Sequence, residues 1–179
     1  DALLLVSALA ASATEIASWT NRPSRVTGYG LLPPIATTGL VEFAPALQTS
    51  FEMAARARRF WEDLGFGVIR VPDAAGLVRA RIVCSLINEA ARALGETGAS
   101  VEDVDRAMEL GMNFPRGPLA WADEIGLDVV LGTLEGLRRY WGDERYHPTP
   151  ALRQRVYAGQ LGKKTGRGFY TYDASRHAR

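Results

Sequence analysis

Cysteine and histidine are scarce in this chain, and their scarcity excludes several kinds of site. Cys84 is the only cysteine among 179 residues, so no disulfide can form within the chain. It falls on the apolar side of a predicted helix, and we therefore expect a buried, unreactive thiol. The two histidines, His147 and His177, lie in a proline-rich turn and in the C-terminal tail. They form no cysteine–histidine cluster of the kind that binds zinc, so we predict no metal site.

Long apolar runs and an excess of one charge are also missing. No apolar run reaches ~18 residues, the length that would span a bilayer, so the sequence predicts no transmembrane helix. The net charge of +1 gives no general reason to expect binding to nucleic acid or to a membrane surface. Hydrophobic residues make up 47% of the chain, which is enough for a sizeable core. We expect a cytoplasmic protein.

The charge is unevenly distributed along the chain. From Ala151 onward there are seven Arg or Lys residues and one acidic residue, Asp173. We interpret this region as a solvated tail, with a site for a phosphate-bearing ligand as the alternative. The opening residues DALLLVSALAAS lack a basic segment and an initiating Met. We interpret them as an internal strand rather than a signal peptide, and the chain as a piece of something longer.

Predicted strands and helices alternate over the first 73 residues. Apolar runs predict strands at 3–8, 25–31, 39–46 and 68–71. The first is continuous enough to predict a strand that is buried on both faces. Helices are predicted at 13–19 and, after the N-cap Ser50, at 51–64. This alternation is typical of βαβ units and a mostly parallel sheet.

Beyond residue 72 the pattern becomes helical, which places a boundary near residue 74. The longest predicted helix has an apolar stripe made of Leu77, Val78, Ile82, Leu86, Ile87, Ala90 and Leu94. Ser100 is the predicted N-cap of a helix over 101–110. Further helices are predicted at 125–141 and 151–158, with Pro118 in a first helical turn, before a short extended end at 168–172.

Three segments of the second half carry a family resemblance. NFPRGPLAWADEIGLD, RYHPTPALRQRV and LGKKTGRGFYTYD resemble the C-terminal helical domain of NAD-dependent 3-hydroxyacyl-CoA dehydrogenases. The chain looks most like the extra C-terminal repeat of the long members that act in phenylacetate and acyl-CoA breakdown. The resemblance implies an α/β, partial Rossmann-like N-terminal part followed by an all-α C-terminal dehydrogenase domain. Residues 1–73 would be a truncated Rossmann-like domain, the end of the NAD-binding domain, and residues 74–179 the helical domain.

The first half departs from the family at the catalytic positions. The family's catalytic His lies in a G-x-H-F-F-N-P-V-P stretch, which matches residues 28–36 of this chain. The resemblance therefore places Gly30 at the catalytic His and Pro33 at the substrate-binding Asn. The serine of the family's N-T-S-S motif falls at Leu9, and the Asn that opens the long helix falls at Ala80. The resemblance thus implies that glycine, proline or an apolar side chain replaces the family's polar group at each of these four positions.

Glu42, twelve residues after Gly30, matches the family's partner carboxylate and is the residual member of the catalytic set. Oxidation of a 3-hydroxyl needs a base that accepts its proton while hydride leaves for nicotinamide, and His suits this role because its pKa lies near 7. Without that imidazole, Glu42 has nothing to orient. We predict instead a surface carboxylate at the end of a strand.

Two glycine-containing segments resemble phosphate-binding loops only in part. The fingerprint G-x-G-x-x-G is absent, and Gly28-Tyr29-Gly30 does not replace it because no helix starts at the required place. The basic segment 163–168, KKTGRG, does not have the spacing of a P-loop and follows no strand. We predict that it is a turn that packs Phe169, Tyr170 and Tyr172 against the helices.

The resemblance leads to a first functional hypothesis. The chain would be the C-terminal portion of an NAD-dependent L-3-hydroxyacyl-CoA dehydrogenase, which oxidises 3-hydroxyacyl-CoA to 3-oxoacyl-CoA in fatty-acid or phenylacetate breakdown. A complete N-terminal copy outside this chain would bind NAD, and this chain would bind no cofactor by itself. Its role would be dimerisation and building one wall of the acyl-CoA cleft.

Two alternatives remain open at this stage. The first is a scaffold or oligomerisation module without catalysis or cofactor, and the second is a stand-alone dehydrogenase with relocated chemistry. We expect a homodimer through the helical half, since its helices carry more apolar surface than a small domain can cover. The residues that suggest this face are Leu86, Ile87, Ala90, Leu94, Val129, Leu131 and Leu134.

Overall fold

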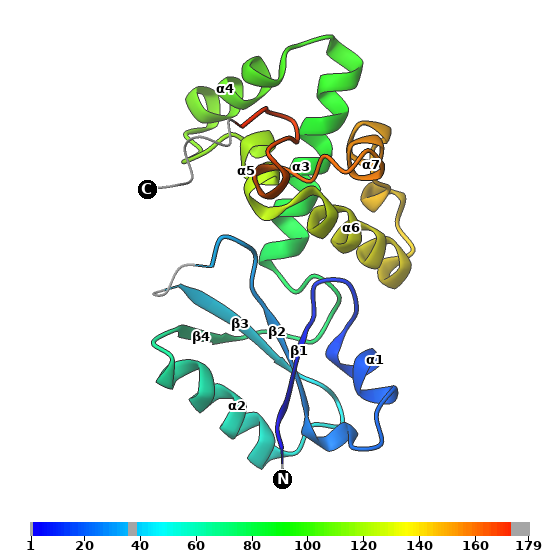
Figure 1. Ribbon diagram of the computed structural model, residues 1–179. Helices are drawn as coiled ribbons and strands as arrows, with labels where there is room; N and C mark the ends of the chain where they lie inside the picture. The colour runs from blue at the N-terminus through cyan, green and yellow to red at the C-terminus, as the bar shows by residue number, and fades with distance from the viewer. Residues whose placement is uncertain (1, 36–38, 173–179) are drawn as a thin grey trace.

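A four-stranded sheet forms one end of the molecule, and a group of helices forms the other (Figure 1). The computed structural model describes residues 2–35 and 39–172. The strands are β1 (Leu4–Ser7), β2 (Val26–Gly30), β3 (Leu40–Pro45) and β4 (Gly67–Arg70), in the spatial order β1-β2-β3-β4. All four strands therefore form where the apolar pattern predicted them.

The sheet is mixed rather than parallel throughout. The β1–β2 and β3–β4 pairs are parallel, as predicted, whereas the central β2–β3 pair is antiparallel. Parallel neighbours need a crossover of about a dozen residues or more, usually a helix. The described residues between β2 and β3, 31–35 and 39, form no such helix.

The prediction that the first strand is buried on both faces is wrong. In the described sheet β1 lies at an edge and pairs only with β2, and its Leu4 side chain is 39% exposed. A continuous apolar run cannot distinguish an edge strand from a central one, because the neighbours come from elsewhere in the chain.

Two helices cover opposite faces of the sheet. On one face, α1 (Ala13–Ser18) packs its Ala13 and Ala17 against Val26 of β2. On the other face, α2 (Phe51–Asp63) places Trp61 with its ring 5.1 Å from that of Tyr29. Val26 and Tyr29 are three residues apart on one strand, so their side chains point to opposite sides. Ser50 caps α2 as predicted, because its side chain accepts a hydrogen bond from the Met53 N–H.

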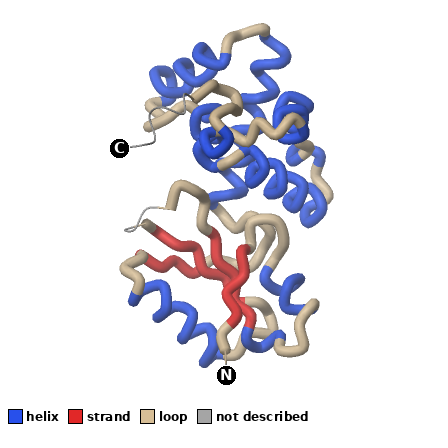
Figure 2. The backbone as a smooth tube through the Cα atoms, in the orientation of Figure 1, coloured by secondary structure: helices blue, strands red, loops and turns tan. Residues whose placement is uncertain are grey.

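The other end of the molecule is built from helices (Figure 2). They are α3 (Arg79–Thr97), α4 (Val101–Met112), α5 (Pro118–Ile125), α6 (Leu127–Trp141) and α7 (Pro150–Tyr157), with the 3₁₀ turns η2 (Glu144–Tyr146) and η3 (Lys163–Thr165). A further 3₁₀ turn, η1 (Pro23–Arg25), lies between α1 and β2 at the sheet end. Ser100 caps α4 and Pro118 opens α5, as predicted. The predicted extended end is reduced to isolated bridges that pair Arg167 with Gly162 and Thr171. No helix among the described residues is long and apolar enough to cross a membrane.

The helix predicted over 125–141 forms as α6, but it begins two residues later than predicted. Gly126 has a φ of +101° and separates α5 from α6, so Ile125 belongs to α5. A Cβ at this position would lie 2.9 Å from Oδ1 of Asp128 and 3.0 Å from Nζ of Lys164. The conformation and the crowding both require glycine, and they interrupt the helix.

The apolar face of α3 is rotated from the predicted stripe. Its buried residues are Ala80, Val83, Cys84, Ile87, Asn88, Ala90 and Ala91. By contrast, Ile82 is 62% exposed and Val78 is 46% exposed. The buried face packs with α5, α6 and α7 in the main hydrophobic core, which Leu32 from the loop after β2 also joins. Cys84 is buried and free, as predicted, and burial raises the pKa of its thiol to about 12.

The two ends of the molecule meet at the loop between β1 and α1. Asp73 accepts hydrogen bonds from the Ala13 and Thr14 N–H groups, at 2.7 and 2.8 Å. Arg139 of α6 donates to the Ala10 carbonyl at 3.0 Å. A Cβ on Gly136 of the same helix would lie 2.1 Å from that carbonyl oxygen. Glycine at position 136 therefore permits α6 to approach the loop backbone directly.

Candidate functional site

Glu42 is buried, so the prediction of a surface carboxylate is wrong. It lies within β3, flanked by β2 and β4, and it is only 3% exposed. Its Oε1 accepts a hydrogen bond from the Arg79 backbone N–H at 3.0 Å, where α3 begins. Burial raises the pKa of the Glu42 carboxyl, and the N–H bond and the positive charge of Arg79 lower it in part.

Gly30 and Glu42 form a cross-strand pair. The antiparallel register of β2 and β3 places the two residues directly opposite each other. A Cβ on Gly30 would lie 3.0 Å from Oε2 of Glu42 and 2.9 Å from Cδ1 of Leu77. Side chains opposite each other in an antiparallel pair are in contact range. The twelve-residue spacing therefore becomes a direct contact, and any side chain at position 30 would adjoin the carboxylate.

The other three family positions contribute only apolar groups. Ala80 is 1% exposed and belongs to the main core, and Leu9 packs against the same core from the loop after β1. Pro33 lies in the loop that follows β2 and lines a pocket instead of contributing an amide. The structure thus brings Gly30 and Glu42 together, but none of the other three positions supplies a polar side chain. Such groups would be needed to hold a substrate alkoxide.

A pocket of about 360 Å³ lies beside this pair of residues. Pro33 and Pro34, Arg79 at the start of α3, Arg116 in the turn before α5, and Trp121 of α5 line it together with apolar side chains. Arg79 and Arg116 were not predicted as site residues. Arg116 and Trp121 stood within a family motif, and Arg79 precedes the position of a family site residue. Only the fold places the three side chains around one cavity.

The described residues do not match a cradle for NAD. The turns from β1 to α1 and from β3 to α2 contain no glycine, whereas the pyrophosphate turn requires close backbone approach. The first amides of α1 are already bound by the Asp73 carboxylate, which occupies the place that a phosphate would take at a helix N-terminus.

The basic segment 163–168 is a packed turn, as predicted. Its two lysines form ion pairs, Lys163 with Glu124 and Lys164 with Asp128. Asp123 accepts hydrogen bonds from the Phe169 and Tyr170 N–H groups at 2.9 and 2.8 Å, and from the Tyr172 hydroxyl at 3.1 Å. Burial raises the pKa of Asp123, and these hydrogen bonds lower it in part. The lysines therefore have structural partners within the chain.

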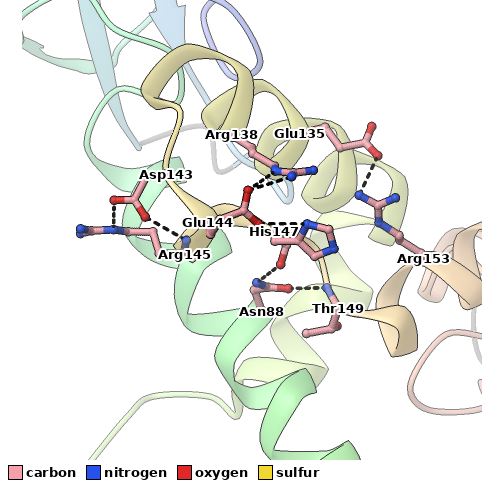
Figure 3. Close-up of polar contacts among 9 residues, drawn as sticks. All are labelled: Asn88, Glu135, Arg138, Asp143, Glu144, Arg145, His147, Thr149 and Arg153. Carbon is pink, nitrogen blue, oxygen red and sulfur yellow. Dashed lines mark hydrogen bonds and ion pairs between the residues drawn. The ribbon is translucent and has the colours of Figure 1, made fainter.

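His147 belongs to a polar network between α6 and α7 (Figure 3). Its Nδ1 lies 3.7 Å from Oε2 of Glu144, which also binds Arg138. Asn88 of α3 holds the turn by donating to the His147 carbonyl and accepting from the Thr149 N–H, both at 2.9 Å. His147 is thus tied to the helical end of the molecule. His177 lies outside the described residues. Within the described ranges, no group of His, Cys, Asp and Glu could hold a metal ion.

Comparison with known proteins defines the family. The family model described as "3-hydroxyacyl-CoA dehydrogenase, C-terminal domain" matches residues 76–172. The chain belongs to this family, as the motifs predicted. It is 46% identical over 160 residues to a "Probable 3-hydroxybutyryl-CoA dehydrogenase" of Bacillus subtilis, which covers 89% of this chain and 56% of the relative. It is 39% identical to the "3-hydroxybutyryl-CoA dehydrogenase" of Clostridioides difficile, over 97% of this chain and 62% of the relative.

A solved structure shows the same fold. The crystal structure of (S)-3-hydroxybutyryl-CoA dehydrogenase from Ralstonia eutropha matches with a TM-score of 0.83 and 41% identity, over 96% of this chain and 60% of that one. The chain therefore spans about three fifths of the length of these relatives. The finer resemblance to an extra C-terminal repeat of long members stays a prediction, because these comparisons do not test it.

Proposed function

We propose that this chain is the C-terminal portion of an NAD-dependent L-3-hydroxyacyl-CoA dehydrogenase and that it serves assembly and cleft building rather than proton transfer. The whole enzyme would oxidise 3-hydroxyacyl-CoA to 3-oxoacyl-CoA in fatty-acid or phenylacetate breakdown, in the cytoplasm. The observation that carries the proposal is the Gly30–Glu42 pair: a buried carboxylate stands opposite a residue without a side chain.

The chemistry of the pair supports an inactive site on this chain. A base must stand within hydrogen-bonding reach of the proton that it removes. Glu42 is enclosed by the sheet, by Leu77 and by the first turn of α3, whose Arg79 N–H it already binds. Gly30, which stands opposite this carboxylate, supplies no imidazole that could accept a proton. Leu9, Pro33 and Ala80 offer no hydrogen bond that would orient a hydroxyl group.

The two parts of the chain would have different roles. Residues 1–73 would be the end of a Rossmann-like domain, and residues 74–179 the helical dehydrogenase domain. NAD would bind to a complete N-terminal copy outside this chain, and this chain alone would hold no cofactor. Support comes from the change from strands to helices near Asp73 and from the absence of a glycine-rich turn in the described strand-to-helix connections.

A homodimer is part of the proposal, although its predicted face needs revision. Ile87 and Leu134 are completely buried within the chain, so they cannot contact a partner. Leu86 instead lines an apolar groove of about 390 Å³ between α3 and α4, together with Val104 and Met108. Exposed apolar side chains, among them Ile82, Leu110 and Met112, lie on the same two helices. A second copy of the chain would cover this surface.

The experiment is an activity and binding assay on the isolated chain. We expect no NADH formation from 3-hydroxybutyryl-CoA or a longer-chain analogue, and no calorimetric signal with NAD. The Bacillus subtilis relative serves as the positive control for assay conditions. Family-like turnover or micromolar NAD binding by this chain would refute the proposal.

The same glycine also supports a second candidate, a scaffold module with no enzyme attached. The intact mass of the source polypeptide separates the two candidates. A source polypeptide much heavier than 19.5 kDa, with a dinucleotide fingerprint upstream, would support the dehydrogenase. A source polypeptide of 19.5 kDa would support the scaffold.

A further inference from the structure

The outer edge of β4 offers backbone groups for pairing with another strand. Among the described residues β4 pairs only with β3, so it forms one edge of the sheet, and α2 lies beside it (Figure 1). The Gly67 and Val71 N–H groups donate toward the β3 side, at 3.1 and 3.0 Å. Because backbone groups alternate in direction along a strand, those of Val68 and Arg70 face away from β3. An edge of this kind is a template for a further strand.

A groove of about 220 Å³ lies between this edge and α2. Apolar side chains from the sheet and from the helix line it: Phe43, Phe51, Ala54, Ala55 and Val68. The small side chains of Ala54 and Ala55 leave the space beside the strand open, and Phe51 is 91% exposed. The volume is below the roughly 300–1,000 Å³ of pockets for small molecules. The groove therefore suits the side chains of an extended peptide better than a separate small ligand.

The charged residues that line the groove are both arginines, Arg58 and Arg70. Arg58 forms an ion pair with Glu62 at 2.7 Å. Arg70 forms no ion pair, cation–π contact or side-chain hydrogen bond with any other described residue. The charges of α2 itself cancel, because its arginines at 56, 58 and 59 are matched by acidic residues at 52, 62 and 63. The positive charge of Arg70 is therefore not balanced by the helix beside it.

The carboxylates of the sheet do not balance Arg70 either. Glu42 alternates with Phe43 along β3, so it points to the opposite face, where it accepts a hydrogen bond from the Arg79 N–H. Asp73 accepts hydrogen bonds from the first amides of α1, which covers that opposite face. Arg70 thus leaves an excess of positive charge on the groove side of the sheet. An acidic side chain on an added strand would complement it.

We propose that the β4 edge and this groove bind an extended peptide segment of a partner protein as an added strand, with an apolar side chain in the groove and an acidic side chain at Arg70. Main-chain hydrogen bonds to Val68 and Arg70 supply the pairing, and alternate peptide side chains, which point to one face, supply the selectivity. A second copy of the chain fits less well, because its own Arg70 would reach the edge and like charges destabilise a strand pair. The proposal goes beyond the proposed function and does not rest on it.

Fluorescence anisotropy with labelled synthetic peptides tests the recognition. The probes are KTETLTK and KTLTETK, which place glutamate and leucine on one face of an extended strand in the two possible chain directions. We expect at least one probe to bind the full chain saturably. Its analogue with lysine in place of the glutamate should bind about fivefold more weakly, since opposite charges across a strand pair attract and like charges repel.

Variants of the edge separate its backbone from its side chains. Val68→Pro removes an outward-facing N–H without breaking a bond to β3, a place where edge strands tolerate proline, and should weaken binding at least about tenfold. Val68→Ala keeps that N–H and measures the loss of the valine side chain alone. Arg70→Glu should weaken binding about fivefold. The control Arg59→Glu, at an exposed position of α2 outside the groove lining, should bind the probe like the parent.

Amide hydrogen exchange on the parent chain tests strand addition without any variant. The bound peptide should slow exchange at the Val68 and Arg70 amides, which face outward in the free chain. The proposal would be overturned by no saturable binding of either peptide at millimolar concentration, by binding that leaves these two amides unprotected, or by affinities unchanged in both Val68→Pro and Arg70→Glu. Protection of the same amides that grows with the concentration of the chain alone would assign the edge to a second copy and would also overturn it. None of these measurements involves NAD or acyl-CoA, so their failure leaves the proposed function intact.

Discussion

Replacing Gly30 with histidine tests whether the family's chemistry can return to this chain. The new Cβ would lie 2.9 Å from Cδ1 of Leu77 and 3.0 Å from Oε2 of Glu42. Both atoms are the ends of side chains, so they can move, but both belong to buried residues. Overpacking of this kind costs about 1–3 kcal/mol. For a chain of this size each kcal/mol lowers Tm by about 2–4 °C.

We expect the variant to fold and to stay inactive. The imidazole would stand beside Glu42, so a His–carboxylate pair would form, and a base alone is worth about 10²–10⁴-fold in rate. Orientation of the substrate contributes as much or more, because effective molarities of positioned groups reach about 10⁵–10⁸ M. Leu9, Pro33 and Ala80 supply none of that orientation, and the described turns offer no site for the hydride acceptor.

The assay is NADH formation from 3-hydroxybutyryl-CoA and from a longer-chain analogue, with Gly30→His measured against the parent. Gly30→Ala introduces the steric cost without the base and shows how much of any change is packing. The double variant Gly30→His, Leu77→Ala relieves the closest contact and should recover part of the lost Tm. Turnover that appears with histidine and not with alanine would refute the reasoning, because it would require intact substrate and cofactor sites.

Three further predictions concern assembly and stability. Gly136→Ala should lower Tm by several degrees, because the Ala10 carbonyl oxygen lies 2.1 Å from the new Cβ. Gly132→Ala on the same helix is the control: its Cβ meets nothing within 4 Å, so the free energy of unfolding should rise by up to about 1 kcal/mol. Burial raises the pKa of Asp123 in the folded chain, so denaturant titrations should show stability falling as pH rises from 3.8 through the raised pKa, and Asp123→Asn should lack that slope. Light scattering should show a dimer for the parent chain and a monomer for Leu86→Asp, because this substitution places a charge in the α3–α4 groove. The control Leu47→Asp, at an 89% exposed position, should stay dimeric. A parent chain that is strictly monomeric at tens of micromolar would contradict this prediction.

The sequence determined the local elements of this protein. Ser50 and Ser100 act as N-caps because their side chains reach backbone N–H groups three residues ahead, a purely local interaction. The strands and most helices form where apolar periodicity placed them. The motifs NFPRGPLAWADEIGLD, RYHPTPALRQRV and LGKKTGRGFYTYD also indicated the family, because such a resemblance depends on residue identities alone. The resemblance also predicts that Gly30 stands at the position of the family's catalytic His.

Tertiary structure decided what those elements do together. Whether Glu42 is exposed depends on β2, β4 and the first turn of α3, which are separate in the sequence. The break at Gly126 depends on contact with Lys164 from a distant turn. Arg79 and Arg116 face one pocket only because α3 and the segment before α5 pack against the loop after β2. The burial of a side chain and the shape of a cavity depend on residues that are distant in the sequence, so no local pattern specifies them.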